Sequence, residues 1–488
     1  MKPVPRTRHA GLLRLLCVLA VALGSLAPAT VVADEAPPLR RVILISCDTL
    51  RSASLPTYGN SGPLATVGLD SLAGAGTLFL HCTTPMGWTL PAHVAMLTGL
   101  SPGAVRAGAE QAVPASVPLL AERLADAGFR CGGFPARNTW LEERFGFARG
   151  MLQYRFQDVL APISAWTRGW APELGLASGP GDTPFFLFFH FMDTHTATVE
   201  FAHRLPYWAI RDIDRFYHGL TEPLPDPRVT PDGRWDLAAY DPDLLRRAYD
   251  STIDSLDLLH LRPLLRHLRE ADLADQTLLI VTGDHGEEIG EHGGFLHESP
   301  HAEVRDVPLI LVWPGVVPAG RVVYTPVSLL DIAPTVLDYA GVPAGDLVQG
   351  LSLRPLLQDP RGFFPDRDFL IDGHRRGLAL EPSALVALEE GAWWSLVAMT
   401  DTTGCAGTYE PARTAEVLAL YNLDLDPAET RDVLADHPQV AAALRLRLDA
   451  ALADEARLAA ALLGETAGAD DRVRLSDEDR RRLRALGY

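Results

Sequence analysis

The chain has 488 residues, of which 47% are hydrophobic and 22% are charged, a composition typical of a globular protein and not of a disordered or fibrous one. This length predicts one large domain and a smaller one. The formal net charge of −19 at pH 7 makes the chain a poor candidate for binding nucleic acid or an anionic membrane surface.

The N-terminus has the pattern of a signal peptide. Lys2 and three arginines precede an apolar run over residues 15–27, and small residues end at Ala33. The run is too short for a comfortable membrane span. We therefore expect residues 1–33 to be removed on export to the periplasm or the exterior, with an uncleaved anchor as the alternative. Processing would change the net charge to −23 and remove Lys2, the only lysine. Anions must then be bound by arginine, histidine, backbone amides or a metal.

Three predicted strands end in groups that can bind a metal. The apolar run over residues 41–47 is followed by Asp48, and the run over 277–282 leads into Asp284 and His285. Ligands bind beyond the carboxyl ends of strands in open α/β sheets. Carboxylates with one imidazole suit Ca²⁺, Mg²⁺, Mn²⁺ or Zn²⁺. The alternative for each residue is an ordinary cap or polar turn.

A third apolar run, residues 185–189, leads into His190, Asp193 and His195. For His190 and Asp193 we favour structural hydrogen bonding around the loop. The stretch after His285 carries further ionisable residues, and we expect three of them to support the loop: Glu287, Glu288 and Glu291.

A threonine precedes a predicted helix between these strands. Pro91 suits the first turn of a helix, and Thr89 suits the N-cap region before it. Backbone amides at a helix N-terminus favour an incoming anion, which makes Thr89 a candidate nucleophile activated by a metal. An ordinary N-cap is the alternative. His93, one turn later, is as easily a core or capping residue as an active one.

Taken together, these motifs resemble the sulfatase family of the alkaline phosphatase superfamily. The matching pieces, in order, are ILISCDTLR, WTLPAHVAMLTGLSP, VPLLAERLADAGFRCGGF, PFFLFFHFMDTH, YDSTIDSLD, LLIVTGDHGEEIGEHG, VPLILVWPG, LLDIAPTVLDYAGV and LYNLDLDPAET. The resemblance implies an alkaline-phosphatase-like α/β/α sandwich with a central, mostly parallel sheet.

The resemblance also implies roles for individual residues. One divalent metal ion would be held by Asp48, Thr89, Asp284 and His285. His297 matches the family histidine that protonates the leaving group, and His195 would contact the substrate or the leaving group. The substrate would be a small-molecule, glycan or lipid ester.

The chain departs from the family pattern in three ways. Family sulfatases have Cys or Ser in place of Thr89 and oxidise it to formylglycine, an aldehyde that threonine cannot form. The arginine of Cys-x-Pro-Ser-Arg is replaced by His93, and the sulfate-binding lysines are absent. These departures favour phosphate mono- or diesters over sulfate esters. A sulfatase that uses unmodified threonine, a transferase forming phospho-Thr89 and a non-catalytic binding protein remain alternatives.

We expect residues 40–361 to form the catalytic domain, with an insertion over the site at 196–245. Short strands without intervening helices predict a small antiparallel subdomain over residues 362–437. Ala/Leu/Arg-rich helices at 438–463 and 476–486 predict a helical tail over 438–488. Disulfide pairing and oligomeric state remain open.

Overall fold

The computed structural model describes residues 37–62, 64, 66–106, 111–136, 138–156, 183–195, 241–297, 299–359, 363–372, 381–400, 414–464 and 473–480. The residues from Pro38 onward form one compact unit. The predicted signal peptide, residues 196–240 of the predicted insertion and residues 481–486 of the last predicted helix lie outside the described residues. No helix within the described ranges is long and apolar enough to cross a membrane.

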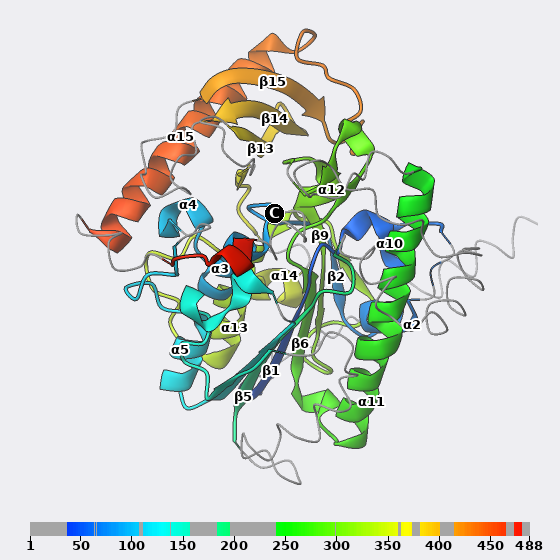
Figure 1. Cartoon of the computed structure of the whole chain (residues 1–488), viewed down its shortest axis with the longest axis vertical. Coiled ribbons are helices and arrows are strands. Elements are labelled where there is room, and N and C mark those ends of the chain that lie inside the picture. Colours follow the sequence, from blue (N-terminus) through cyan, green and yellow to red (C-terminus); the bar gives the residue numbers. More distant parts are fainter. Residues whose placement is uncertain are drawn as a thin grey trace, which may run out of the picture. The chain divides into compact units, whose positions relative to one another are not determined.

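A mostly parallel sheet forms the centre of this unit (Figure 1). Strand β1 (Arg41–Cys47) lies between β5 (Phe185–Phe191) and β6 (Leu278–Gly283) and is parallel to both. Strand β9 (Asp306–Val312) runs antiparallel to its two neighbours. The remaining described strands of the sheet are β2 (Thr77–Thr83), β3 (Arg130–Pro135), β4 (Gln153–Tyr154), β10 (Arg321–Val323) and β11 (Val327–Ser328).

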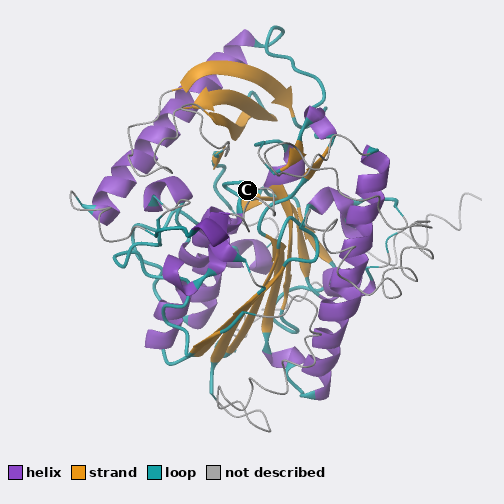
Figure 2. Ribbon diagram, in the orientation of Figure 1, coloured by secondary structure: helices purple, strands orange, loops and turns teal. Residues whose placement is uncertain are grey.

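Helices cover both faces of the sheet, as Figure 2 shows. Successive side chains of a strand point to opposite faces, so Val42 and Leu44 of β1 enter one hydrophobic core and Ile43 and Ile45 enter the other. The first face is covered by α3 (Thr89–Thr98), α5 (Leu120–Asp126), α13 (Ile332–Ala340) and α14 (Arg354–Gln358). The second is covered by α2 (Val67–Ala75), α10 (Pro242–Leu256) and α11 (Arg262–Glu270).

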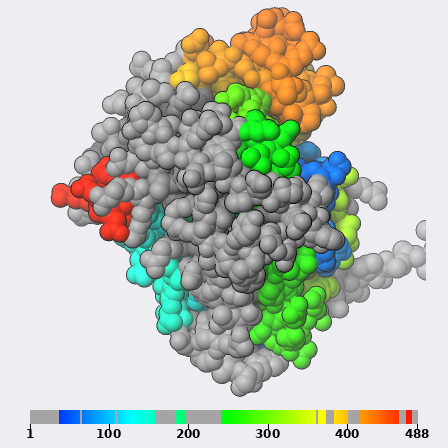
Figure 3. Space-filling model, turned by 45° about the vertical axis from the view of Figure 1, so that its right-hand side comes forward, coloured from blue at the N-terminus to red at the C-terminus, as the bar shows by residue number. Residues whose placement is uncertain are grey.

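A separate antiparallel sheet follows in the sequence. Its strands are β12 (Phe369–Ile371), β13 (Glu381–Glu389), β14 (Ala392–Thr400) and β15 (Thr414–Asn422). Helix α15 (Pro438–Leu463) packs its leucines against this sheet. Atoms of residues 381–400 and of residues after 414 lie at the top of the face seen in Figure 3. The predicted fold class, a sandwich with a small antiparallel subdomain, is therefore confirmed, whereas the exact domain boundaries stay predictions.

Two local elements differ from the sequence expectations. Helix α3 begins at Thr89, and Trp88 occupies the N-cap position expected for Thr89. Strand β5 continues past residue 189 because its pairing with β1 extends to Phe191, so His190 lies inside the strand opposite Ser46.

Candidate functional site

The register of the central strands brings two carboxylates together. Cys47, the last residue of β1, pairs with Phe191 on one side and Gly283 on the other. The amide of Asp48 donates to the carbonyl of Phe191 at 2.8 Å, and the amide of Asp284 donates to the carbonyl of Cys47 at 3.3 Å. Asp48 and Asp284 are both fully buried beyond the carboxyl edge of the sheet.

The Asp284 carboxylate has one satisfied and one unsatisfied oxygen. Its Oδ1 accepts hydrogen bonds from the amides of Thr49 (3.1 Å) and His285 (2.8 Å). Its Oδ2 has no hydrogen-bond partner among the described residues and lies 3.7 Å from His285 Nε2. Asp48 Oδ1 likewise has no hydrogen-bond partner among the described residues, and it lies 3.6 Å from His285 Nε2.

His285 completes a set of atoms suited to a cation. Its Nδ1 lies 2.9 Å from the Gly286 carbonyl. Donation there leaves a lone pair on Nε2, which has no hydrogen-bond partner among the described residues. Buried polar atoms normally have partners. A divalent cation would satisfy Asp48 Oδ1, Asp284 Oδ2 and His285 Nε2 at once, so the residues present fit the predicted metal.

Thr89 lies beside this set. Its Oγ1 is 3.4 Å from Asp48 Oδ2, and as the first residue of α3 it stands at the helix N-terminus. The same carboxylate oxygen accepts a hydrogen bond from Asn138 Nδ2 at 3.1 Å and lies 3.3 Å from His190 Nε2. These contacts fix the orientation of Asp48 toward the hydroxyl.

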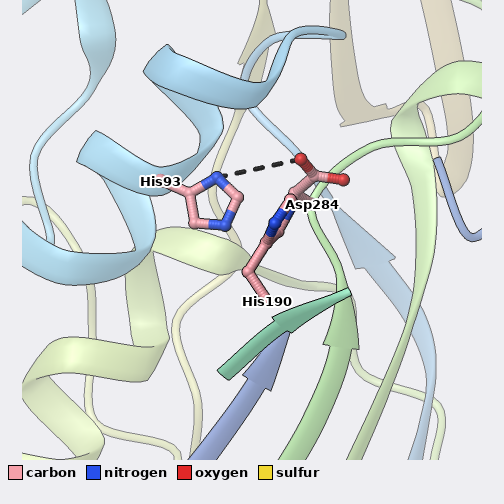
Figure 4. Close-up of side chains that lie close together, drawn as sticks. All are labelled: His93, His190 and Asp284. Carbon is pink, nitrogen blue, oxygen red and sulfur yellow. Dashed lines mark ion pairs between the residues drawn. The ribbon is translucent and has the colours of Figure 1, made fainter. Parts of the chain in front are cut away.

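Two histidines lie beside Asp284, His93 from α3 and His190 from β5 (Figure 4). His93 Nδ1 is 2.7 Å from the Thr89 carbonyl and 3.7 Å from Asp284 Oδ2. Its ring lies 5.0 Å from that of His190, centroid to centroid. Burial, reinforced by His190, lowers the pKa of His93 to about 3, so this ring is neutral at pH 7. A neutral ring thus stands at the sequence position of the arginine in the family motif Cys-x-Pro-Ser-Arg.

The predicted substrate histidines lie next to His285. The His297 ring centroid is 4.6 Å from that of His285 and 5.6 Å from that of His195. Glu287, fully buried, places its Oε2 3.7 Å from His297 Nδ1. Burial lowers the pKa of His195 to about 4, against the opposing charges of Asp48 and Glu287.

The two carboxylates differ in how readily they carry charge. Burial acts to raise the pKa of Asp48, but the neighbouring His195, His190 and His285 together bring it well below its usual value. For Asp284, burial and the charge of Asp48 raise the pKa well above its usual value. The two carboxylates together therefore hold one negative charge easily and a second only with difficulty, which a bound cation would relieve.

The structure brings all six predicted site residues together: Asp48, Thr89, His195, Asp284, His285 and His297. Their roles stay predictions. Sequence reasoning missed Asn138 and assigned His190 a loop role, whereas both contact Asp48. Asn138 follows the end of β3, so the rule applied to the other strand ends could have found it. The side chain of Asp193 pairs with His260, whose Nε2 lies 3.2 Å from Asp193 Oδ1.

Comparisons with known proteins agree with this geometry. The sequence matches the Sulfatase family over residues 40–342. The chain therefore belongs to the sulfatase family. Arylsulfatase K of Canis lupus familiaris is 30% identical over 186 residues, and this match covers 37% of the chain and 32% of that relative. The matched region thus spans about a third of the relative's length.

Two solved structures share the fold. The structure of BT4656 in complex with its substrate D-glucosamine-2-N,6-O-disulfate has a TM-score of 0.64 at 16% identity and covers 85% of this chain and 98% of that one. The phosphonate monoester hydrolase of Agrobacterium radiobacter has a TM-score of 0.61 at 21% identity and covers 86% of this chain and 96% of that one. At these identities the comparison establishes the fold.

Proposed function

We propose that this protein is an exported, metal-dependent hydrolase of sulfate or phosphate esters in which unmodified Thr89 is the nucleophile. The supporting observation is the position of Thr89 Oγ1, 3.4 Å from Asp48 Oδ2. The other oxygen of that carboxylate, Asp48 Oδ1, lies near His285 Nε2, as does Asp284 Oδ2, and these three atoms have no hydrogen-bond partner among the described residues. Export rests on the pattern of residues 1–33 alone.

The proposed reaction has two displacement steps. A divalent cation bound by Asp48, Asp284 and His285 would supply a positive charge that favours ionisation of the Thr89 hydroxyl, whose proton is released to water. Thr89 Oγ forms a bond to sulfur or phosphorus as the bond to the ester oxygen breaks. His297 donates a proton to the departing alcohol, and Glu287 holds the His297 ring. Water then displaces Thr89 from the covalent intermediate.

The charges around Thr89 favour a singly charged ester. Lys2 is the only lysine of the sequence. The described side chains in contact with the two aspartates include histidines, a threonine and an asparagine, and Glu287 lies beside His297. A sulfate ester or a phosphodiester carries one negative charge, whereas a phosphate monoester carries two near neutral pH. The proposed cation would offset the charges of Asp48 and Asp284, so the second charge of a monoester would meet Glu287 with little positive charge left to balance it. A small-molecule or glycan ester fits the family.

The test measures turnover of three substrates, once by enzyme whose metal has been removed with a chelator and once by enzyme supplemented with metal. We expect metal-dependent turnover of p-nitrophenyl sulfate or bis-p-nitrophenyl phosphate, with p-nitrophenyl phosphate the poorest substrate. Thr89→Ala is expected to lower turnover by about 10³-fold or more, and Thr89→Ser to retain part of it. Absence of turnover of all three by a folded, metal-loaded protein would favour a binding role. Transfer to an added alcohol in preference to water would indicate a transferase.

A further inference from the structure

A second cluster of metal-binding side chains lies in the loop that follows His285 and is separate from the aspartate pair. It consists of Glu288, His292 and Glu303, whose candidate ligand atoms all lie within 4.8 Å of one another. His292 Nε2 is 3.2 Å from Glu303 Oε2. The sequence predicted only loop support for Glu288, and neither His292 nor Glu303 takes part in the reaction proposed above.

Three different elements supply these side chains. Glu288 begins the short strand β7 (Glu288–Ile289), His292 lies in the 3-10 turn Glu291–Gly293, and Glu303 lies in α12 (Ala302–Arg305). The loop backbone is already attached to this helical turn, because the amide of Glu287 donates to the carbonyl of Glu303 at 3.0 Å. A convergence of this kind, from segments held by backbone hydrogen bonds, is what a cation site requires.

Glu288 provides an independent sign of a missing partner. It is only 3% exposed, and its Oε1 has no hydrogen-bond partner among the described residues. Gly294 lies so close that a Cβ there would be 2.4 Å from Glu288 Oε2, so the backbone confines this carboxylate within the cluster. A buried carboxylate oxygen without a partner is costly in free energy.

The surrounding charges agree with a cation. Burial raises the pKa of Glu288 to about 7, against a hydrogen bond with Ser299 and the influence of His292, and the charges of Glu303 and Glu291 add to the effect of burial. Hydrogen bonding and charge from Glu303 raise the pKa of His292. The two carboxylates and the imidazole lie close enough to share one divalent cation, which would offset the negative charge gathered here.

We propose that Glu288, His292 and Glu303 form a zinc site distinct from the site at Asp48 and Asp284. Two carboxylates and one imidazole match the ligand types of tetrahedral zinc, with water completing the coordination. Imidazole and carboxylate are both common zinc ligands, so zinc is the ion chosen for the test. The ion would join the loop leading to His297 to α12 and so hold that histidine near the candidate active site.

The test measures zinc stoichiometry by equilibrium dialysis and elemental analysis of the full chain. Two zinc equivalents are expected for the wild type, one for His292→Gln, and one for Asp284→Asn, which removes a ligand of the other site. The double variant is expected to bind none. Glu291→Gln is the matched control because it lies in the same turn but pairs with Arg51 and Arg246. It should retain the wild-type stoichiometry.

Glu288→Gln provides a second variant of nearly unchanged shape, and circular dichroism verifies that each variant is folded. Stoichiometry in folded His292→Gln and Glu288→Gln equal to that of the wild type would overturn the proposal. So would a loss of zinc in Glu291→Gln equal to that in His292→Gln. Because the readout is bound metal, it holds whether or not the enzyme turns over any of the esters tested above.

Discussion

His93 Nδ1 lies 3.7 Å from Asp284 Oδ2 and 2.7 Å from the carbonyl oxygen of Thr89. One imidazole therefore touches both the residue proposed as nucleophile and a carboxylate proposed as metal ligand. All three residues are fully buried, so water cannot replace either contact if the imidazole is removed. This relationship leads to the first prediction.

His93→Ala is expected to weaken metal binding about 10- to 100-fold, because the partner that orients a metal ligand contributes on this scale. Titration calorimetry with the chelated protein measures the change. His260→Ala is the control, since His260 is an equally buried histidine that pairs with Asp193 instead. Equal weakening in both variants would show that His93 acts only through general stability.

His297 and Glu287 are expected to matter most for esters with poor leaving groups. An alkoxide needs a proton as it departs, whereas p-nitrophenolate does not. His297→Asn should lower kcat for alkyl esters about 10²-fold or more and for p-nitrophenyl esters by less than about 10-fold. Glu287→Gln should show the same pattern more weakly. A uniform loss on both classes of ester, measured side by side, would contradict the role of acid.

Glu429 is expected to stabilise the protein above pH 4.5. Its carboxylate pairs with the buried Arg305 at 2.8 Å, and against the effect of burial this pair lowers its pKa to about 2 from 4.5. The folded state thus binds fewer protons, so this stability is present above pH 4.5 and is lost as the pH falls toward 2. Glu429→Gln should lower the free energy of unfolding by about 3 kcal/mol at pH 7.

Urea unfolding at pH 7 and at pH 3 measures this contribution. The difference between Glu429→Gln and the wild type should shrink at the lower pH. Asp436→Asn is the matched control, because Asp436 forms an exposed ion pair with Arg431 in the same region. A difference in stability that is independent of pH would contradict the assignment.

Glu455 is expected to have the opposite pH dependence. Burial, together with the charge of Asp372, raises its pKa to about 8 from 4.5. The folded state therefore retains a proton that the unfolded state loses, and stability declines as the pH rises from 4.5 through about 8. Glu455→Gln should remove this decline, and its free energy of unfolding at pH 9 should exceed that of the wild type by about 1 kcal/mol or more.

Thermal unfolding between pH 6 and pH 9 tests this expectation. Asp454→Asn, at the adjacent exposed position of α15, should follow the wild-type profile. A steeper alkaline decline in Glu455→Gln than in the wild type would show that the charged carboxylate is stabilising instead.

The sequence by itself predicted the family, the strands that lead to Asp48 and Asp284, and six candidate site residues that the structure brings together. It could do so because an apolar run followed by Asp48, Asp284 or His195 is a pattern of neighbouring residues, and such patterns can be read directly from the sequence. The antiparallel character of the second sheet followed in the same way, from short strands without helices between them.

Only the tertiary structure decided which atoms face one another. The sequence could not show that Asn138 and His190 share one oxygen of Asp48, or that His93 reaches Asp284. Those contacts depend on strand register and on the start of α3, which are set by pairing between segments distant in the chain. The cluster of Glu288, His292 and Glu303 was hidden for the same reason, since Glu303 joins it only when α12 folds back against the loop.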